Sequence, residues 1–142
     1  MNKLLENFNE TLLSGGFVIG PFMKTCDPAF VEVAGYSGFH FAILDMEHGP
    51  VSIKNLENLI CRAILSDLVP IVRVPDSSTV SIGKALDVGA LGIQVPQIQN
   101  ADQAKKVISR AKFSPTGERG LCRFVRSANY SAMDRYEYLR KA

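Results

Sequence analysis

The chain has 142 residues, of which 46% are hydrophobic and 21% are charged, and its formal net charge is +2. This length corresponds to about one ordinary domain, and the hydrophobic content predicts a packed core and excludes a largely disordered chain. The charge is too small, and the basic residues are too scattered, to indicate binding to nucleic acid.

The segments, taken in chain order, alternate between strand-like and helix-like patterns. Short apolar runs bounded by glycine or proline predict strands at 16–23, 39–45, 69–75 and 91–98. Capping residues, glycine stops and, in the second helix, apolar residues at helical spacing predict helices at 27–38, 52–67, 78–90 and 100–113. Asp27 before Pro28, Ser52, and Asn100 with Gln103 three residues later are the expected caps.

Four strand–helix units in succession predict an α/β fold with a parallel sheet, because each strand is nearly continuously apolar. This rhythm fits the N-terminal half of a (β/α)8 TIM barrel, a fold that typically needs about 250 residues. A doubly wound open sheet is the competing architecture, but "KTCDP" after the first strand lacks its phosphate-binding glycines. Residues 114–142 contain no fifth strand pattern and end in a predicted helix from about Ser131, so residues 1–142 are expected to form one partial domain with a C-terminal helical extension.

The three cysteines, Cys26, Cys61 and Cys122, are far apart and form no CxxC motif. This argues against a disulfide framework or a zinc site and for reduced thiols in a cytoplasmic protein. The N-terminus does not resemble a signal peptide, and no apolar run approaches the roughly 20 residues that cross a membrane. We therefore expect no membrane association.

Polar residues gather where the predicted strands end. Asp45, Glu47 and His48 follow the second strand, Arg73 lies near the end of the third, and Asp87 lies late in the helix before the fourth. The carboxyl ends of parallel strands form the functional edge of such folds, where a histidine, acids and an arginine can perform acid–base chemistry on an anionic substrate. Each residue taken alone also fits a structural reading: a hydrogen-bonding histidine, a salt-bridge arginine, or an aspartate that holds a loop.

Four motifs in order resemble the HpcH/HpaI aldolase family, which includes 4-hydroxy-2-oxoheptanedioate and 2-dehydro-3-deoxyglucarate aldolases. The motifs are "LDMEHGP", "VRVP", "ALDVGALGIQVPQIQNADQA" and "FSPTGERGL", and the resemblance runs from about residue 10 to 130. It implies a class II, metal-dependent aldehyde-lyase on a TIM barrel, which cleaves a 4-hydroxy-2-oxo acid to pyruvate and an aldehyde.

The resemblance also implies roles for the strand-end residues. His48 corresponds to the catalytic acid/base, and Asp87 to the carboxylate that pairs with it, with Asp45 as a second partner of the same ring. Glu47 corresponds to a residue that holds metal-bound water. Arg73 corresponds to the arginine that binds the 2-oxo acid and stabilises its enolate.

The resemblance implies a divalent cation, Mg, Mn or Co, whose ligands are expected beyond Ala142, so this chain is expected to hold no metal site of its own. We expect the N-terminal half of a barrel, inactive or weakly active alone, that forms a homo-oligomer or pairs with a C-terminal half because its sheet edges are open. The alternative is a non-catalytic remnant or assembly module of the same fold. A relative that cleaves acyl-CoA thioesters ranks lowest, because no adenine-binding signature is present.

Overall fold

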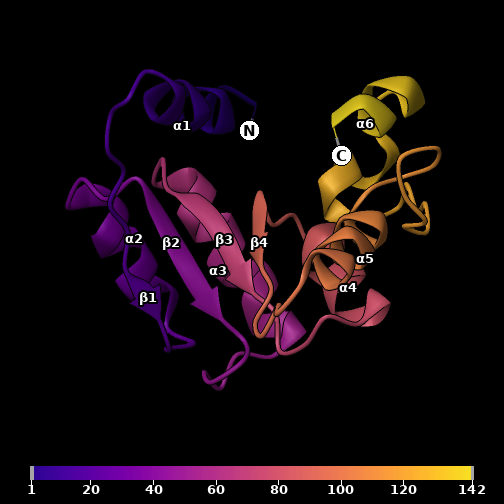
Figure 1. Ribbon diagram of the computed structural model, residues 1–142. Coiled ribbons are helices and arrows are strands. Elements are labelled where there is room, and N and C mark those ends of the chain that lie inside the picture. The colour runs from indigo at the N-terminus through magenta and orange to yellow at the C-terminus, as the bar shows by residue number, and fades with distance from the viewer. Residues whose placement is uncertain (1, 142) are drawn as a thin grey trace.

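The computed structural model describes residues 2–141, which form alternating helices and parallel strands (Figure 1). In chain order the elements are α1 (Asn2–Leu13), β1 (Phe22–Met23), α2 (Pro28–Tyr36), β2 (Phe41–Asp45), α3 (Ile53–Leu65), β3 (Val69–Arg73), α4 (Thr79–Asp87), β4 (Gly92–Gln94), α5 (Ala101–Ala111), the 3-10 helix η1 (Arg126–Ser131) and α6 (Arg135–Lys141). All four predicted strand–helix units are present. Helix α1 is the one α-helix of the described residues that the sequence patterns did not predict.

The sheet is parallel throughout, with the order β1-β2-β3-β4, as the alternating pattern predicted. Asp45, the last residue of β2, lies opposite Arg73, the last residue of β3, and Arg73 lies opposite Gln94 of β4. In Figure 1 the strands end together at one edge, and α1 lies across the edge at which they begin. The register therefore brings the strand-end residues to a common mouth.

Strand β1 is much shorter than the predicted run of 16–23. The preceding residues still follow β2, since the His40 backbone N–H donates to the Ile19 carbonyl at 2.8 Å and the Ile43 N–H donates to the Pro21 carbonyl at 2.9 Å. Pro21 has no N–H of its own to complete a ladder, which limits the regular strand to its last two residues. The Ile19 N–H donates to Nδ1 of His40 at 3.2 Å, so this imidazole closes the beginning of β2.

The predicted helix caps are confirmed. Asp27, Ser52 and Asn100 each accept a hydrogen bond from a backbone N–H two or three residues further on. The Gln103 side chain reaches back and accepts from a backbone N–H just before its helix, at 2.7 Å. These contacts satisfy N–H groups that would otherwise have no partner at the helix start.

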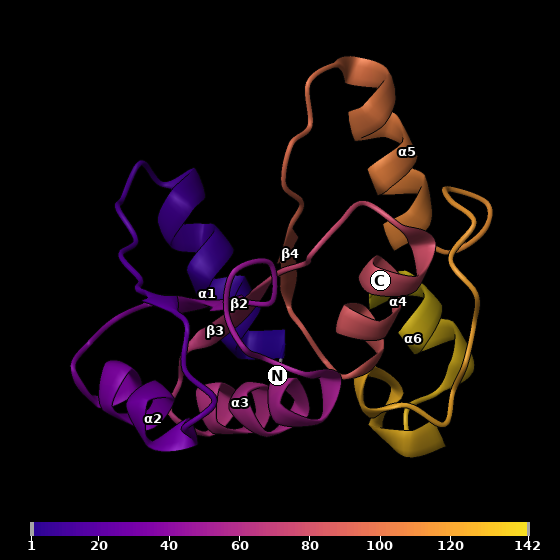
Figure 2. The ribbon, with the colours of Figure 1, turned by 90° about the horizontal axis from the view of Figure 1, so that it is seen from below.

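The main core lies between the sheet and the helices that follow its strands. In Figure 2, α2 and α3 run along one face of the sheet. The fully buried large side chains of this main core include Leu44, Leu56, Leu59, Ile60, Val72 and Ile82. The opposite, concave face carries half-buried apolar residues, Ile43 and Ile71 among them, and α1 contacts its edge through an edge-to-face pair of Phe8 and Phe41 with ring centroids 5.9 Å apart.

The C-terminal segment forms a second, smaller core around Phe113, Ala128, Met133 and Tyr138. It contains η1 and α6 and adds no strand to the sheet within residues 2–141. This agrees with the predicted helical extension, although the α-helix begins at Arg135 and not near Ser131. No helix within residues 2–141 is both long and apolar enough to cross a membrane.

Candidate functional site

The centre of the strand-end cluster is an ion pair between Asp45 and Arg73. The guanidinium donates from Nε to Oδ1 at 2.9 Å and from Nη2 to Oδ2 at 2.7 Å, the parallel two-bond geometry that fixes both groups. Asp45 is completely buried, whereas the Arg73 side chain is 18% exposed. The carboxylate therefore anchors the guanidinium from within the fold and leaves its outer edge facing the mouth.

Asp45 also fixes the loop that follows β2. Its Oδ1 accepts the backbone N–H of Glu47 at 3.0 Å and that of His48 at 3.2 Å. The hydrogen bonds from Arg73, opposed by burial and assisted by these two N–H groups, lower the pKa of Asp45 to about 2. Pairing with Asp45 in turn raises the pKa of Arg73 above its ordinary value. One buried carboxylate thus positions the Arg73 side chain and the backbone of Glu47 and His48.

Glu47 links the arginine to the histidine. Its Oε2 lies 3.1 Å from Nη1 of Arg73, and its Oε1 lies 3.6 Å from Nε2 of His48. The Glu47 side chain is 13% exposed, while that of His48 is 62% exposed. The histidine ring therefore stands in solvent at the mouth with a carboxylate beside it, as an acid or base that must exchange protons with a ligand would.

Two features of the site were not singled out from the sequence. The ring of Phe22, the first residue of β1, lies under the Arg73 guanidinium with 5.1 Å between Cζ and the ring centroid, a cation–π contact. Gly49 lies so close to the Asp45 carbonyl oxygen and to the Lys24 backbone that a Cβ there would collide with the carbonyl. Phe22 lies near the end of the predicted strand 16–23, which was a usable signal, but the close approach at Gly49 is visible only in three dimensions.

The predicted pairing of Asp87 with His48 is not formed in this structure. Asp87 ends α4, and a helix that follows a parallel strand returns its C-terminus to the edge where strands begin. There Oδ1 of Asp87 accepts from Nη2 of Arg119 at 2.8 Å, and the Arg119 guanidinium also lies over the Phe113 ring, 4.6 Å from its centroid. Asp45, the second expected partner of the His48 ring, binds Arg73 instead.

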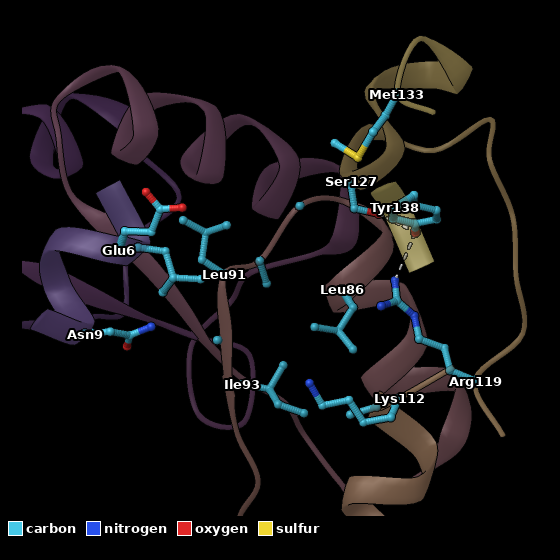
Figure 3. Close-up of a pocket in the computed structure, with 15 residues that line it drawn as sticks. Glu6, Asn9, Leu86, Leu91, Ile93, Lys112, Arg119, Ser127, Met133 and Tyr138 are labelled. Carbon is cyan, nitrogen blue, oxygen red and sulfur yellow. Dashed lines mark hydrogen bonds between the residues drawn. The ribbon is translucent and has the colours of Figure 1, made fainter. Parts of the chain in front are cut away.

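A pocket lined in part by Arg119 lies away from His48. It has a volume of about 470 Å³ and opens between α1, β4, α5 and the C-terminal segment (Figure 3). Leu86, Leu91 and Ile93 form apolar walls, and Arg119 and Tyr138 lie on the side of the C-terminal segment. This cavity follows the outer edge of β4 and does not include the strand-end cluster.

Residues 2–141 contain no group of three or more His, Cys, Asp or Glu side chains that could hold a metal ion. The Glu47 carboxylate beside the His48 ring and the Asp45 carboxylate are both bound to Arg73. The described side chains therefore do not by themselves fit the divalent cation that the family resemblance implies.

Comparisons with known proteins match most of the chain. The model of the family described as HpcH/HpaI aldolase/citrate lyase matches residues 19–136. The 2-dehydro-3,6-dideoxy-6-sulfogluconate aldolase of Pseudomonas putida is 31% identical over 83% of this chain and 46% of its own length. The hydroxypyruvate/pyruvate aldolase of Roseobacter denitrificans is 31% identical over 93% of this chain and 52% of its own.

A solved structure supports the fold class. The HpcH/HpaI aldolase from Desulfitobacterium hafniense matches with a TM-score of 0.84 and 24% identity, over 94% of this chain and 51% of that one. The chain thus spans about half the length of the relatives it matches. The predicted α/β class, with four strand–helix units of a barrel, is confirmed.

Proposed function

Because the chain belongs to the HpcH/HpaI aldolase/citrate lyase family, we propose that it carries acid–base and substrate-binding residues of a carbon–carbon lyase. The proposed reaction is the retro-aldol cleavage of a 4-hydroxy-2-oxo acid to pyruvate and an aldehyde. The observation that supports it most directly is the Arg73 guanidinium, anchored by the buried Asp45 at the mouth and linked through Glu47 to an exposed His48.

Arg73 is suited to bind the oxo acid. A guanidinium has five N–H donors, and the two hydrogen bonds to Asp45 use one on Nε and one on Nη2. The ion pair with Glu47 lies at Nη1, so donors on Nη1 and Nη2 are left for a ligand. A planar pair of donors matches a carboxylate or an oxo-acid oxygen, and its charge stabilises the enolate oxygen that forms during cleavage.

His48 is suited to move the proton. In the proposed step the imidazole takes the proton of the 4-hydroxyl group while the bond between C3 and C4 breaks. The bonding electrons pass to the ketone oxygen and give the enolate of pyruvate, and the aldehyde leaves. Protonation of the enolate carbon then yields pyruvate. The Glu47 carboxylate beside Nε2 stabilises the imidazolium that exists between these two proton transfers.

In the family resemblance a divalent cation would act as a Lewis acid on the oxo acid. Because residues 2–141 contain no group of side chains that could hold it, the proton transfer and bond cleavage are assigned to His48 and Arg73 alone. For the same reason we expect the chain alone to release pyruvate slowly, and the test of its own residues needs a readout that is separate from turnover.

The test combines binding of pyruvate with turnover. Pyruvate is titrated into isotope-labelled chain and followed by amide chemical shifts, and pyruvate release from a panel of 4-hydroxy-2-oxo acids is assayed with Mg, Mn or Co. Arg73→Lys should weaken pyruvate binding, because lysine cannot reproduce the two-donor fork. His48→Gln should leave binding intact and lower any turnover by about 10²-fold or more.

The second histidine of the chain provides the matched control. His40→Gln changes an imidazole at the other end of β2 and should alter neither readout. A folded chain that neither binds pyruvate nor releases it under any of these conditions would favour the non-catalytic assembly module.

A further inference from the structure

The sheet ends in two open edges. Its strands are parallel in the order β1-β2-β3-β4, and within residues 2–141 no other strand covers β1 or β4. A two-fold axis along the axis of a closed barrel places β4 of one copy beside β1 of another, with all strands still running in the same sense. We propose that two copies of this chain close in this manner into one eight-stranded barrel, whatever reaction the strand-end cluster performs.

The first supporting surface is one flank of α2. Successive helical residues are turned by about 100°, so the neighbours of Val31, which is buried against the core, lie on opposite flanks. Glu32 faces α3, because its carboxylate pairs with Arg62 at 3.0 Å. Phe30 and Val33 therefore lie on the flank away from α3, and each is 60% exposed. This is the flank that faces outward past the β1 edge.

The second surface is the corresponding flank of α5. Arg110 marks the side that faces α4, because its Nη1 donates to the Ser77 carbonyl just before that helix. Val107 packs against the core. Ile108 and Ala104 lie on the remaining side, away from α4, and Ile108 is 55% exposed. In the proposed pair α5 of one copy meets α2 of the other, so that small Ala104 leaves room for the Phe30 ring and the two aliphatic side chains Val33 and Ile108 pack against each other.

The concave face supports the same arrangement. Ile19 and Phe22, at the β1 edge, are 52% and 50% exposed, and Phe22 is in register with Ile43 on this face. At the β4 edge the cavity of about 470 Å³ is walled by apolar side chains, as Figure 3 shows. The interior of a (β/α)8 barrel is filled by layers of apolar side chains. Closure would therefore bury these apolar residues and give the backbone N–H and C=O groups at the β1 and β4 edges hydrogen-bonding partners.

The pairing also has a consequence for the site. Both copies contribute their strand ends to one mouth, so two Asp45–Arg73 clusters would face each other across it. Each cluster is built from β2 and β3 of a single chain and remains intact whether or not the pair forms. Assembly and ligand binding can therefore be measured separately.

The experiment measures the mass of the full chain by light scattering during gel filtration over a wide range of concentrations. We expect twice the chain mass of 15.6 kDa. Val33→Lys places a charge on the seam and should return the mass to that of one chain with an unchanged circular dichroism spectrum. Tyr36→Lys is the matched control, since Tyr36 is 80% exposed on the same helix but does not share this flank, and it should remain paired.

A cross-linking arm tests which surfaces meet. Val33→Cys and Ile108→Cys chains, both with the exposed Cys122 replaced by serine, are mixed and oxidised. Disulfide-linked dimers should form in the mixture and not in either chain alone. The proposal is overturned by a single-chain mass at every concentration, by Val33→Cys chains that link to each other, or by a chain that pairs only with a polypeptide carrying the other half of a relative's barrel.

Discussion

Two aspartate–arginine pairs stand at opposite ends of this sheet, and they differ in which partner is buried. At the carboxyl ends of β2 and β3, Asp45 is fully buried and Arg73 reaches toward the mouth. At the other end, the Arg119 side chain is 5% exposed and Asp87 is 31% exposed. The buried Asp45 orients Arg73 so that the guanidinium can reach a ligand. The N–H donors of the buried Arg119, in contrast, lie inside the protein.

The surroundings of the two arginines reinforce the contrast. Arg73 has Glu47 and the exposed His48 next to it, which are groups that can exchange protons. Arg119 has the Phe113 ring and the Tyr138 hydroxyl, the latter 3.5 Å from Nη2. The first pair therefore belongs to chemistry at the mouth and the second to the attachment of the C-terminal segment.

The largest effect is expected from Asp45→Ala. Removal of the carboxylate leaves the Arg73 charge without its main partner and two backbone N–H groups without an acceptor, so the free energy of unfolding should fall by about 3–5 kcal/mol. Urea unfolding followed by circular dichroism measures it. Asp102→Asn, which removes an exposed 3.9 Å pair with Lys105, is the control and should change stability by less than about 0.5 kcal/mol. Equal losses in the two variants would contradict the anchoring role of Asp45.

A smaller loss is expected from Asp87→Asn at the other end. The Arg119 guanidinium would keep a hydrogen-bonding partner but lose the charge that compensates it, at a cost of about 1–3 kcal/mol in unfolding free energy. Pyruvate binding should be unchanged, because Asp87 is not part of the mouth in this structure. If the Asp87→Asn protein is as stable as the wild type but releases pyruvate more slowly, Asp87 acts on proton transfer. That result would support the pairing with His48 that the family resemblance implies.

The free energy of unfolding at acid pH should depend on the protonation of Asp45. Arg73 lowers its pKa from 3.8 to about 2, so the folded state binds this proton less readily than the unfolded chain. The stabilisation is complete above about pH 4 and is lost as the pH falls toward 2, with a total of about 2 kcal/mol. The pKa values of Asp76 and Asp134 are also lowered, so the wild-type curve is compared with that of Asp45→Asn. Two parallel curves between pH 4 and 2 would be inconsistent with this contribution.

The smallest effect is expected from Phe22→Leu. Loss of the ring face under Arg73 removes a cation–π contact worth about 0.5–1 kcal/mol, which corresponds to roughly a two- to fivefold weaker affinity for pyruvate if the contact orients the guanidinium. Amide shift titration measures this change. Phe17→Leu alters an 81% exposed ring outside the site and should have no effect. If both variants bind pyruvate equally more weakly, the loss comes from a general change of the protein surface and not from the contact with Arg73.

Much of this architecture is predictable because it depends on local chemistry. Ser52 and Asn100 begin helices through hydrogen bonds within their own turn, and the continuous apolar character of β2 and β3 requires cover on both faces. The predicted strand ends brought Asp45 and Arg73 to the same edge of the sheet, but their pairing was not predicted. The motifs at Glu47 and His48 could be assigned to the site for the same reason.

The remaining features depend on tertiary contacts that no local pattern encodes. Helix α1 is held in part by Phe8 against Phe41, a contact across more than thirty positions, and the sequence before Gly15 had suggested no element. Asp87 carried a family motif, but its partner was decided by the direction in which α4 returns to the sheet and by Arg119 of the C-terminal segment. In both cases the deciding contact lies outside the motif.

The two histidines of the chain stand at opposite ends of β2. His40 accepts the Ile19 N–H through Nδ1 where the strand begins, and His48 stands in solvent beyond its end. Because there are no other imidazoles in the sequence, a proton spectrum of the ring hydrogens should contain one set of signals for each end of the strand. A ligand at the mouth should shift the His48 signals alone, and a disturbance of the β1 edge should first shift those of His40, so the unmodified protein carries its own pair of spectroscopic reporters.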